Sequence, residues 1–204
     1  MSGTNANTPR GLQPYAYSWG APYNGAVDVF YVPSSNGTAL YVGDPVVFTQ
    51  NSADAQGVPV VTIATAGSTN KISGVFMGRA NNANELITTV TQATNVYLPV
   101  STASYVYVAS DPNLLYWAQE DSVGGSMAYT SGGGNTASLV AGTGSTVTGF
   151  SGWQLQSSGV SSSANTTFQL RLLGTVRGPD NAFGTNCKWV VRLNLPQLWS
   201  LTGV

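Results

Sequence analysis

The sequence predicts an all-β protein whose antiparallel strands form a sandwich or a barrel. Three observations support this fold class. Apolar residues alternate with polar ones or form short blocks, and these recur about every 8–12 residues, as in sandwich and barrel proteins. Turn-forming Gly, Pro and Asn lie between the blocks. No segment makes a convincing helix, because residues 81–94, the best candidate, contain a β-branched run from Ile87 to Thr91 that favours a strand.

Eleven segments carry the strand pattern, separated by turn signals at 34–37, 42–45, 110–113 and 178–184. The expected strands are 26–32, 38–42, 45–49, 58–64, 71–77, 85–91, 95–100, 104–109, 114–119, 166–173 and 188–194. In the last two, the period of two assigns one buried and one solvent-facing side. The buried side is expected to hold Phe168, Leu170, Leu172, Trp189, Val191 and Leu193, and the other side Gln169, Arg171, Lys188, Val190 and Arg192.

The chain divides into an N-terminal arm, residues 1–20, and a single body, residues 21–204. A body of this length can bury a full core as one β domain. Within it, residues 122–165 carry no charge and are rich in Gly, Ser and Thr. They also contain large apolar side chains, which linkers rarely do, so we expect short strands and long loops held by packing or by a partner.

The arm is predicted to be extended, because proline restricts both itself and the residue before it. Two interpretations of its apolar side chains are open. They fold back and cover a sheet edge, or they reach a neighbouring subunit and order on contact. Aromatic residues and arginine are common in binding hot spots, which slightly favours the second interpretation. The candidate interface residues are Arg10, Leu12, Tyr15, Tyr17 and Trp19.

The chain has very little charge. Only 7% of its residues are charged, against about 25% in an ordinary soluble domain. Four basic side chains in residues 171–204 are too few to indicate nucleic-acid binding, and we interpret them as solvated charges on separate strands. No apolar stretch is long enough to span a membrane, and the N-terminus lacks the apolar run of a signal peptide, so we expect synthesis and folding in a cytoplasm.

The sequence predicts no enzymatic activity. It contains no histidine, which removes Ser-His-Asp and Cys-His catalysis, and its one cysteine cannot make a zinc site. Cys187 is expected to be a buried free thiol. The adjacent acids Glu120 and Asp121 would point to opposite faces of a strand, a poor arrangement for two-carboxylate catalysis, and we place them in a turn. No cofactor or metal is expected, although a Ca²⁺ site built from distant acids stays open.

A sugar-binding platform is the alternative use of the aromatic residues. The chain has five tryptophans and ten tyrosines, but aromatic residues in strand-rich proteins are mostly core and cross-strand pairs. Trp117 and Trp153 are the candidate sugar-binding residues, because neither lies in a clean alternating strand.

Three stretches of the chain resemble, in the same order, a group of tailed-bacteriophage head proteins described as cement, decoration or minor capsid proteins. They are "NTPRGLQPYAYSWGAPYNGAVDVFYVPSSNGTALYVGDPVVF", "YVYVASDPNLLYWAQEDSVGG" and "GTVRGPDNAFGTNCKWVVRLN". The resemblance is weakest across residues 122–165 and rests on turns and strands, with no catalytic signature. It implies a β-sandwich or jelly-roll body on the outside of a phage head, bridging neighbouring major capsid subunits.

The expected partner is therefore the major capsid protein, and the expected location is the exterior of the virion after synthesis in the host cytoplasm. A surface with few charges suits close contact with a fixed partner, because desolvating ions is the expensive event at an interface. We also expect a homo-oligomer, a dimer rather than a trimer, since two-fold contacts are the commonest closed arrangement. The runner-up is a sugar-binding domain of a phage tail fibre or spike.

Overall fold

The structure is a computed structural model that describes residues 5–80, 97–161 and 166–197. Its regular elements are strands and two single 3-10 turns, η1 (Tyr129–Gly132) and η2 (Ser157–Gly159). The predicted all-β class is therefore confirmed, and nearly all strand pairs are antiparallel. The strand expected at 85–91 lies outside the described residues. Among the described residues, no helix has the length and apolarity needed to cross a bilayer.

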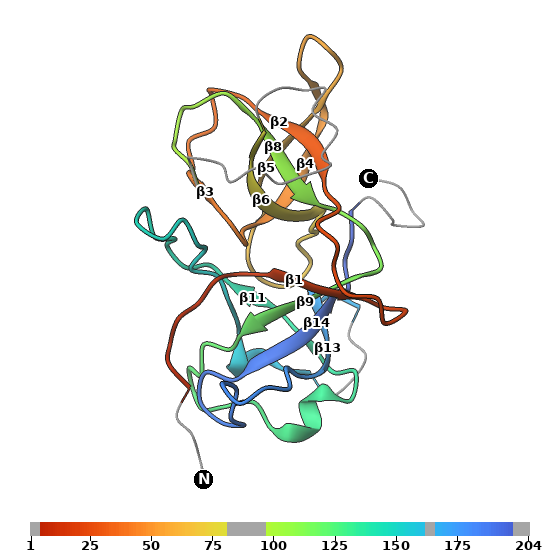
Figure 1. The fold of residues 1–204 in the computed structure, drawn as a ribbon, viewed down its shortest axis with the longest axis vertical. Helices are drawn as coiled ribbons and strands as arrows, with labels where there is room; N and C mark the ends of the chain where they lie inside the picture. Colours follow the sequence, from red (N-terminus) through yellow and green to blue (C-terminus); the bar gives the residue numbers. More distant parts are fainter. Residues whose placement is uncertain (1–4, 81–96, 162–165, 198–204) are drawn as a thin grey trace.

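Five strands close into a barrel, which forms the upper part of the molecule in Figure 1. The order around the barrel is β2 (Asp28–Val32), β5 (Pro59–Ile63), β4 (Pro45–Ala53), β6 (Gly74–Ala80) and β8 (Ser104–Ala109). Strands β2 and β5 pair in parallel, and the other pairs are antiparallel. The short pair β3 (Leu40–Tyr41) and β7 (Tyr97–Leu98) lies beside them. We call this part, residues 28–80 and 97–109, the barrel lobe.

The second part is an open five-stranded sheet, the sheet lobe, in the lower half of Figure 1. Its order is β1 (Gln13–Tyr17), β9 (Leu114–Gln119), β14 (Lys188–Leu193), β13 (Leu170–Thr175) and β10 (Thr136–Ala137). The small pair β11 (Leu139–Val140) and β12 (Gln154–Leu155) lies next to it. The uncharged segment thus contributes three short strands and both 3-10 turns, in agreement with the expected short strands and long loops.

The barrel lobe interrupts the sheet lobe in sequence. Strands β1 and β9 are direct neighbours, with Gln13 opposite Trp117 and Tyr17 opposite Leu114, yet all the barrel strands lie between them along the chain. The two ends of the barrel lobe are therefore held side by side by one strand pair.

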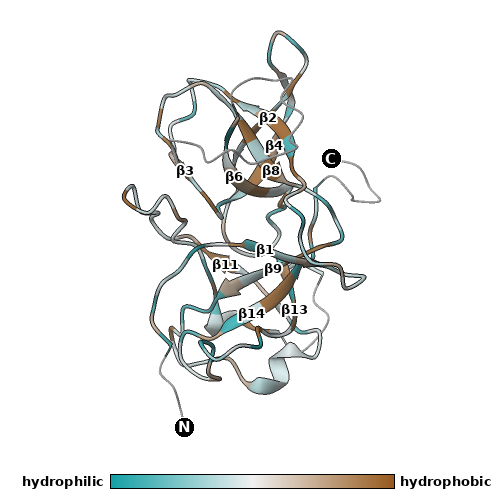
Figure 2. Ribbon diagram, in the orientation of Figure 1, coloured by the Kyte–Doolittle hydropathy of each residue, from teal (hydrophilic) through white to brown (hydrophobic). Residues whose placement is uncertain are grey.

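The cores of the two lobes differ in extent. One apolar cluster lies inside the barrel and is made only of barrel-lobe residues. The larger cluster lies under the open sheet and also includes Ile72, Val75 and Ala109 from the barrel lobe, so the two lobes share a core. In Figure 2 the apolar residues lie mainly on the strands of both lobes, and the connecting loops are more polar.

Period two predicts the faces of β14 correctly but fails before β13 at Phe168, which is half-buried, and at Gln169. Trp189, Val191 and Leu193 are buried, and Arg192 is exposed. Gln169, however, is fully buried rather than solvent-facing. The strand begins only at Leu170, so the alternation does not extend back to Gln169.

The buried amide of Gln169 joins three segments. Its Oε1 accepts hydrogen bonds from Gly67 N and Leu139 N, both at 3.1 Å, and its Nε2 donates to Thr65 O at 2.9 Å. It therefore ties the loop after β5 to β11 and to the start of β13. Buried backbone groups require such partners, and here one amide supplies three of them.

A second amide, Gln197, ties the C-terminal segment to the barrel. Its Oε1 accepts from Phe48 N at 2.7 Å and from the Ser73 hydroxyl, and its Nε2 donates to Phe48 O at 3.2 Å. Backbone bonds between Ile72 and Leu195 and between Gln197 and Ile72 run alongside. The chain after β14 thus crosses from the sheet lobe back to the barrel lobe.

Candidate functional site

The N-terminal segment is bound to the sheet lobe by two polar side chains. The Asn5 amide donates to Ala182 O (2.6 Å) and Thr185 O (2.9 Å) and accepts from Ala182 N (2.9 Å). The buried Gln119 accepts from Thr8 N at 2.9 Å and donates to Ala6 O at 2.8 Å. Residues 5–8 therefore lie on the body of the protein.

Residues 13–17 form edge strand β1, so the structure has the arrangement in which the arm covers a sheet edge. Leu12 is 0% exposed and Tyr17 is buried, both within the shared core. Neither can contact a partner, which corrects their place among the candidate interface residues. A proline within the strand is compatible with an edge position, and Pro14 has one here.

A close backbone approach fixes where the segment crosses the barrel lobe. Leu12 N donates to Gly43 O at 2.9 Å, and a Cβ built on Gly43 would lie 2.0 Å from Arg10 O. Gly43 also has φ +101°, a region that favours glycine. Any side chain at residue 43 would push the two segments apart.

The other three candidates of the N-terminal segment stay at the surface. Trp19 is 63% exposed and Tyr15 is 44% exposed. The Arg10 guanidinium, on an exposed residue, lies 4.5 Å above the centre of the Phe150 ring. The structure therefore leaves Arg10, Tyr15 and Trp19 as accessible groups, two of them on β1 and the turn that follows it.

Trp19 is held outward by its neighbour. Its ring stacks on Tyr17 with centroids 4.6 Å apart and planes 7° apart. The Tyr17 hydroxyl donates to Asn24 Oδ1 at 3.0 Å, and Ser18 N donates to Asn113 O at 2.8 Å. The turn after β1 is thus anchored on both sides. Because the exposed Trp19 ring is already held in place, it has little side-chain entropy left to lose on binding a partner.

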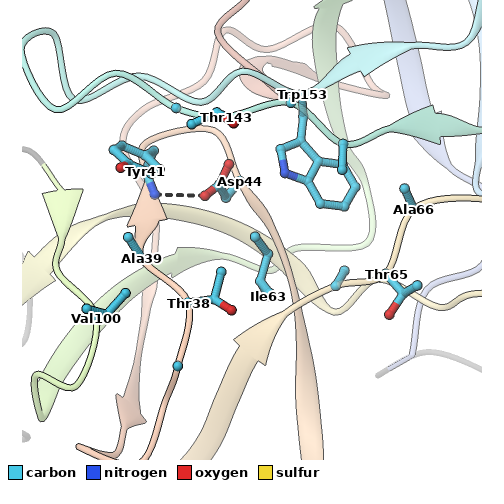
Figure 3. Close-up of a pocket in the computed structure, with 15 residues that line it drawn as sticks. Thr38, Ala39, Tyr41, Asp44, Ile63, Thr65, Ala66, Val100, Thr143 and Trp153 are labelled. Carbon is cyan, nitrogen blue, oxygen red and sulfur yellow. Dashed lines mark hydrogen bonds between the residues drawn. The ribbon is translucent and has the colours of Figure 1, made fainter.

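A groove of about 800 Å³ runs between the barrel lobe and the loop that joins β11 to β12. Figure 3 shows side chains from both parts around it. Its walls are small or apolar, with a few hydroxyl groups. The lining residues are Gly37, Thr38, Ala39, Tyr41, Asp44, Ile63, Ala64, Thr65, Ala66, Val100, Ala141, Gly142, Thr143, Gly144 and Trp153.

Asp44 is the charged residue in this lining, and it is buried. Its Oδ2 accepts a hydrogen bond from Tyr41 N at 2.8 Å, the dashed line in Figure 3, while Oδ1 has no hydrogen-bond partner. Burial raises the pKa of Asp44 to about 6, although the Ser151 hydroxyl and the Tyr41 N–H act in the opposite direction. The oxygen is enclosed, so this carboxylate is poorly placed to meet a ligand directly.

The two candidate sugar-binding tryptophans lie in different sites. Trp153 borders the groove, but only 3% of its surface is exposed and it belongs to the shared core. Trp117 lies on β9, half-buried, with the Lys188 ammonium 5.5 Å from its ring centre. Stacking a sugar requires an open ring face, and Trp153 lacks one.

Glu120 forms an isolated bridge with Leu155 rather than lying in a turn, and its buried oxygens are occupied. Oε2 accepts from Met127 N at 3.0 Å and from Trp189 Nε1 at 3.1 Å, and Oε1 accepts from the Ser122 hydroxyl at 3.2 Å. Burial raises the pKa of Glu120, against the effect of these hydrogen bonds. The adjacent Asp121 accepts from Ser157 N at 2.9 Å and from its hydroxyl at 2.7 Å.

These contacts give both carboxylates a structural role, because each closes a loop onto the sheet. The sequence offered no sign of it, since a buried acid surrounded by backbone donors has no local motif. Cys187 is a buried free thiol, as predicted, and burial raises its pKa. Within the described parts of the chain, no three acidic or thiol side chains gather in a group that could hold a metal ion.

Neither a protein-family model, nor a curated protein sequence, nor a solved structure matches the chain.

Proposed function

We propose that the protein is a non-enzymatic structural protein that docks on another protein through the edge formed by β1 and the turn after it. The observation that carries the proposal is the exposed Trp19, fixed by its stack on Tyr17, with the exposed Tyr15 on the same strand and Arg10 just before it. Tryptophan, tyrosine and arginine are the residue types that dominate binding hot spots. A rigid aromatic side chain also loses little entropy on binding.

The finer proposal is a cement or decoration protein on the outside of a tailed-phage head, bound to the major capsid protein. It comes from the resemblance of the three sequence stretches and is supported by the low charge of the chain. The sandwich or jelly-roll description stays a prediction of the resemblance, and the proposal needs only an all-β body. A homo-oligomer, a dimer first, is part of the same proposal.

Heating assembled heads with and without the protein tests the proposal. A ligand specific for the intact shell must stabilise it by mass action, so decorated heads should rupture at a higher temperature. Trp19→Ser should reduce occupancy while the free protein keeps its melting temperature. Equal rupture temperatures for bare and decorated heads would refute the cement function. Light scattering of the free protein tests the dimer, and a monomer at micromolar concentration would contradict it.

Sugar binding is the second candidate, and the groove is the observation that favours it. Its volume lies in the range of small-molecule sites, about 300–1,000 Å³. Trp153→Ala is a poor test, because the side chain is part of the core. Thr143→Trp fills the groove instead, and Val147→Trp on the same loop is the matched control, since Val147 is exposed and does not line the groove. Saturable glycan binding lost only in Thr143→Trp would establish this function.

A further inference from the structure

The outer face of the open sheet carries an unbalanced set of positive charges. On β14, Lys188, Val190 and Arg192 face away from the core, and on β13 Arg171 and Leu173 are exposed. The other face of the same strands packs into the shared core. Leu115 and Trp117 of β9 continue the outer face and are half-buried. The face therefore combines three cations with an apolar strip.

Two of these cations lie directly opposite each other. Arg171 of β13 is the register partner of Arg192 of β14. Cβ atoms of such cross-strand partners are about 5 Å apart, and like charges in these positions destabilise a sheet. The fold alone gives no reason to place two arginines there, since either position could hold a neutral polar residue.

The two guanidinium groups have few partners within the protein. Arg192 Nε donates to Pro112 O at 3.3 Å. The Arg171 guanidinium lies against Gly134, where an added Cβ would be 3.2 Å from its Nη2. Among the described residues, Pro112 O is the hydrogen-bond acceptor found for these two guanidinium groups.

The nearby carboxylates have other hydrogen-bond partners. Asp111, in the turn before β9, accepts a hydrogen bond from Asn113 N at 2.7 Å, and Asp121 is bound to Ser157. Asp180 borders a small pocket of about 360 Å³ that Lys188 also lines. The Lys188 ammonium lies over the Trp117 ring.

We propose that this face, centred on the opposed Arg171 and Arg192, binds an acidic surface of a partner protein. The inference rests on the proposed docking function and names the chemistry of the partner. Arginine forms bidentate bonds to carboxylates, and a pair of carboxylates between the two side chains would satisfy both. The exposed Leu173 and the partly buried Trp117 supply an apolar contact beside them. Three cations are too few for a duplex, whose binding needs many phosphate contacts.

The melting temperature of variants at Arg171 or Arg192 distinguishes a binding role from a structural one. If the arginines serve the fold, replacing one should lower the melting temperature. If they serve a partner, replacing one should leave the melting temperature unchanged or raise it at low salt, because like-charge repulsion is relieved. Stability gained with binding lost is the usual sign of a functional site.

The experiment uses the full chain and a capped hexaglutamate peptide, with capped hexaglutamine and a short DNA duplex as comparison probes. At low salt the protein should bind hexaglutamate and not hexaglutamine, and the Arg171→Gln, Arg192→Gln double variant should bind about tenfold more weakly. Lys71→Gln removes one charge from the barrel lobe and should bind as the parent does. Equal binding by parent and double variant would overturn the inference, as would a double variant that melts lower. Preference for the duplex over the peptide would also overturn it, in favour of nucleic acid.

Assembled heads distinguish this inference from the proposed function. Heads that bind the parent and the double variant equally leave the cement function standing and reject the cationic face. Heads that bind neither, while hexaglutamate binding still depends on the two arginines, reject the cement function and keep an acidic protein as the partner.

Discussion

The barrel lobe and the sheet lobe stabilise their interiors in different ways. The apolar cluster inside the barrel consists of Phe30, Val32, Leu40, Val46, Val61, Phe76, Leu98, Val106 and Val108. The described part of the barrel lobe buries two short polar side chains, Asp44 and Ser73, whereas the sheet lobe buries long ones, among them Gln119, Glu120 and Gln169, each 0% exposed. A closed barrel pairs its backbone around the ring, whereas an open sheet joined by irregular loops must find other partners for its buried N–H and C=O groups.

Buried neutral amides explain how a chain with so little charge holds its long loops in place. Neutral amides bind several backbone groups each, and they lose less solvation on burial than ions do. Gln119, Gln169 and Asn5 each bind three backbone groups. The abundant Asn and Gln of the sequence are thus part of the interior as well as the surface.

Deleting residues 2–19 should have the largest effect and should break the sheet lobe. The deletion removes edge strand β1, the buried Leu12 and Tyr17, and two partners of Gln119. We expect a chain that aggregates or melts far below the parent in thermal unfolding. Trp19→Ser, a change in the same segment at an exposed side chain, should melt as the parent does. A truncated chain with unchanged melting would instead restore the interpretation of the arm as a free tether.

Phe76→Ala should destabilise the barrel by creating a cavity. Phe76 is fully buried in the apolar cluster, and truncating a buried phenylalanine costs about 3–5 kcal/mol. Denaturant unfolding of the variant measures this loss. Phe183→Ala, the same change at a half-exposed residue, should cost less than about 1 kcal/mol. Similar losses at the two positions would contradict the described packing of the barrel.

Two substitutions at Glu120 test whether the stability of the sheet lobe depends on polar contacts or on the negative charge. Glu120→Ala leaves the N–H groups of Met127 and Trp189 without an acceptor, at a cost of about 2–4 kcal/mol in the free energy of unfolding. Glu120→Gln keeps one oxygen for both donors, and its amide nitrogen can donate to the Ser122 hydroxyl. That variant should unfold within about 1 kcal/mol of the parent. If Gln is as damaging as Ala, the negative charge itself is required.

Asp44→Asn should stabilise the protein by an amount that depends on pH. The pKa of Asp44 rises from 3.8 to about 6 in the fold, so the fold favours the protonated acid. Its contribution to stability is complete below about pH 4 and is lost as the pH rises through 6. Asparagine is neutral throughout, so the variant should be more stable than the parent by about 3 kcal/mol at pH 8 and equal to it near pH 4.

Asp54→Asn is the control with the opposite sign. The Tyr105 hydroxyl donates to Asp54 at 2.5 Å and lowers the pKa of this exposed carboxyl. Its stabilisation is present above its unfolded pKa and is lost as the pH falls, so this variant should lose stability at pH 8. A stabilising effect of both substitutions would show that general charge, rather than burial, governs the result.

Local pattern predicted the regular strands well and missed the contacts between distant segments. The expected strands 104–109 and 114–119 match β8 and β9 to the residue, since both are short, β-rich and bounded by turn residues. Strand β1 was missed because Pro14 and the mixed composition around it resemble an extended arm. Nothing local indicates that the ends of β1 and β9 meet, or that β2 and β5 pair in parallel.

The site residues show the same division. The sequence did not separate the exposed Trp19 from the buried Tyr17, because both lie in the same aromatic stretch. Burial of Glu120 and Gln169 depends on backbone donors from segments remote in sequence, such as Gly67 N and Met127 N. The opposition of Arg171 and Arg192 depends on the register of β13 and β14, which alternation alone does not set. A charged pair of this kind becomes visible only once the strands are aligned.

The position of the barrel lobe between β1 and β9 has a consequence for the order of folding. Pairing Tyr17 with Leu114 closes a long loop, and the entropy lost in closing a flexible loop grows with its length. A barrel that has already folded holds its own ends close together and removes most of that loss. We therefore expect the barrel amides to gain protection in pulsed hydrogen exchange before those of β9 and β14. Simultaneous protection would contradict this order. During synthesis, β1 leaves the ribosome before its neighbour β9 has been made. The barrel strands are made between the two, so the barrel can fold before β1 pairs with β9.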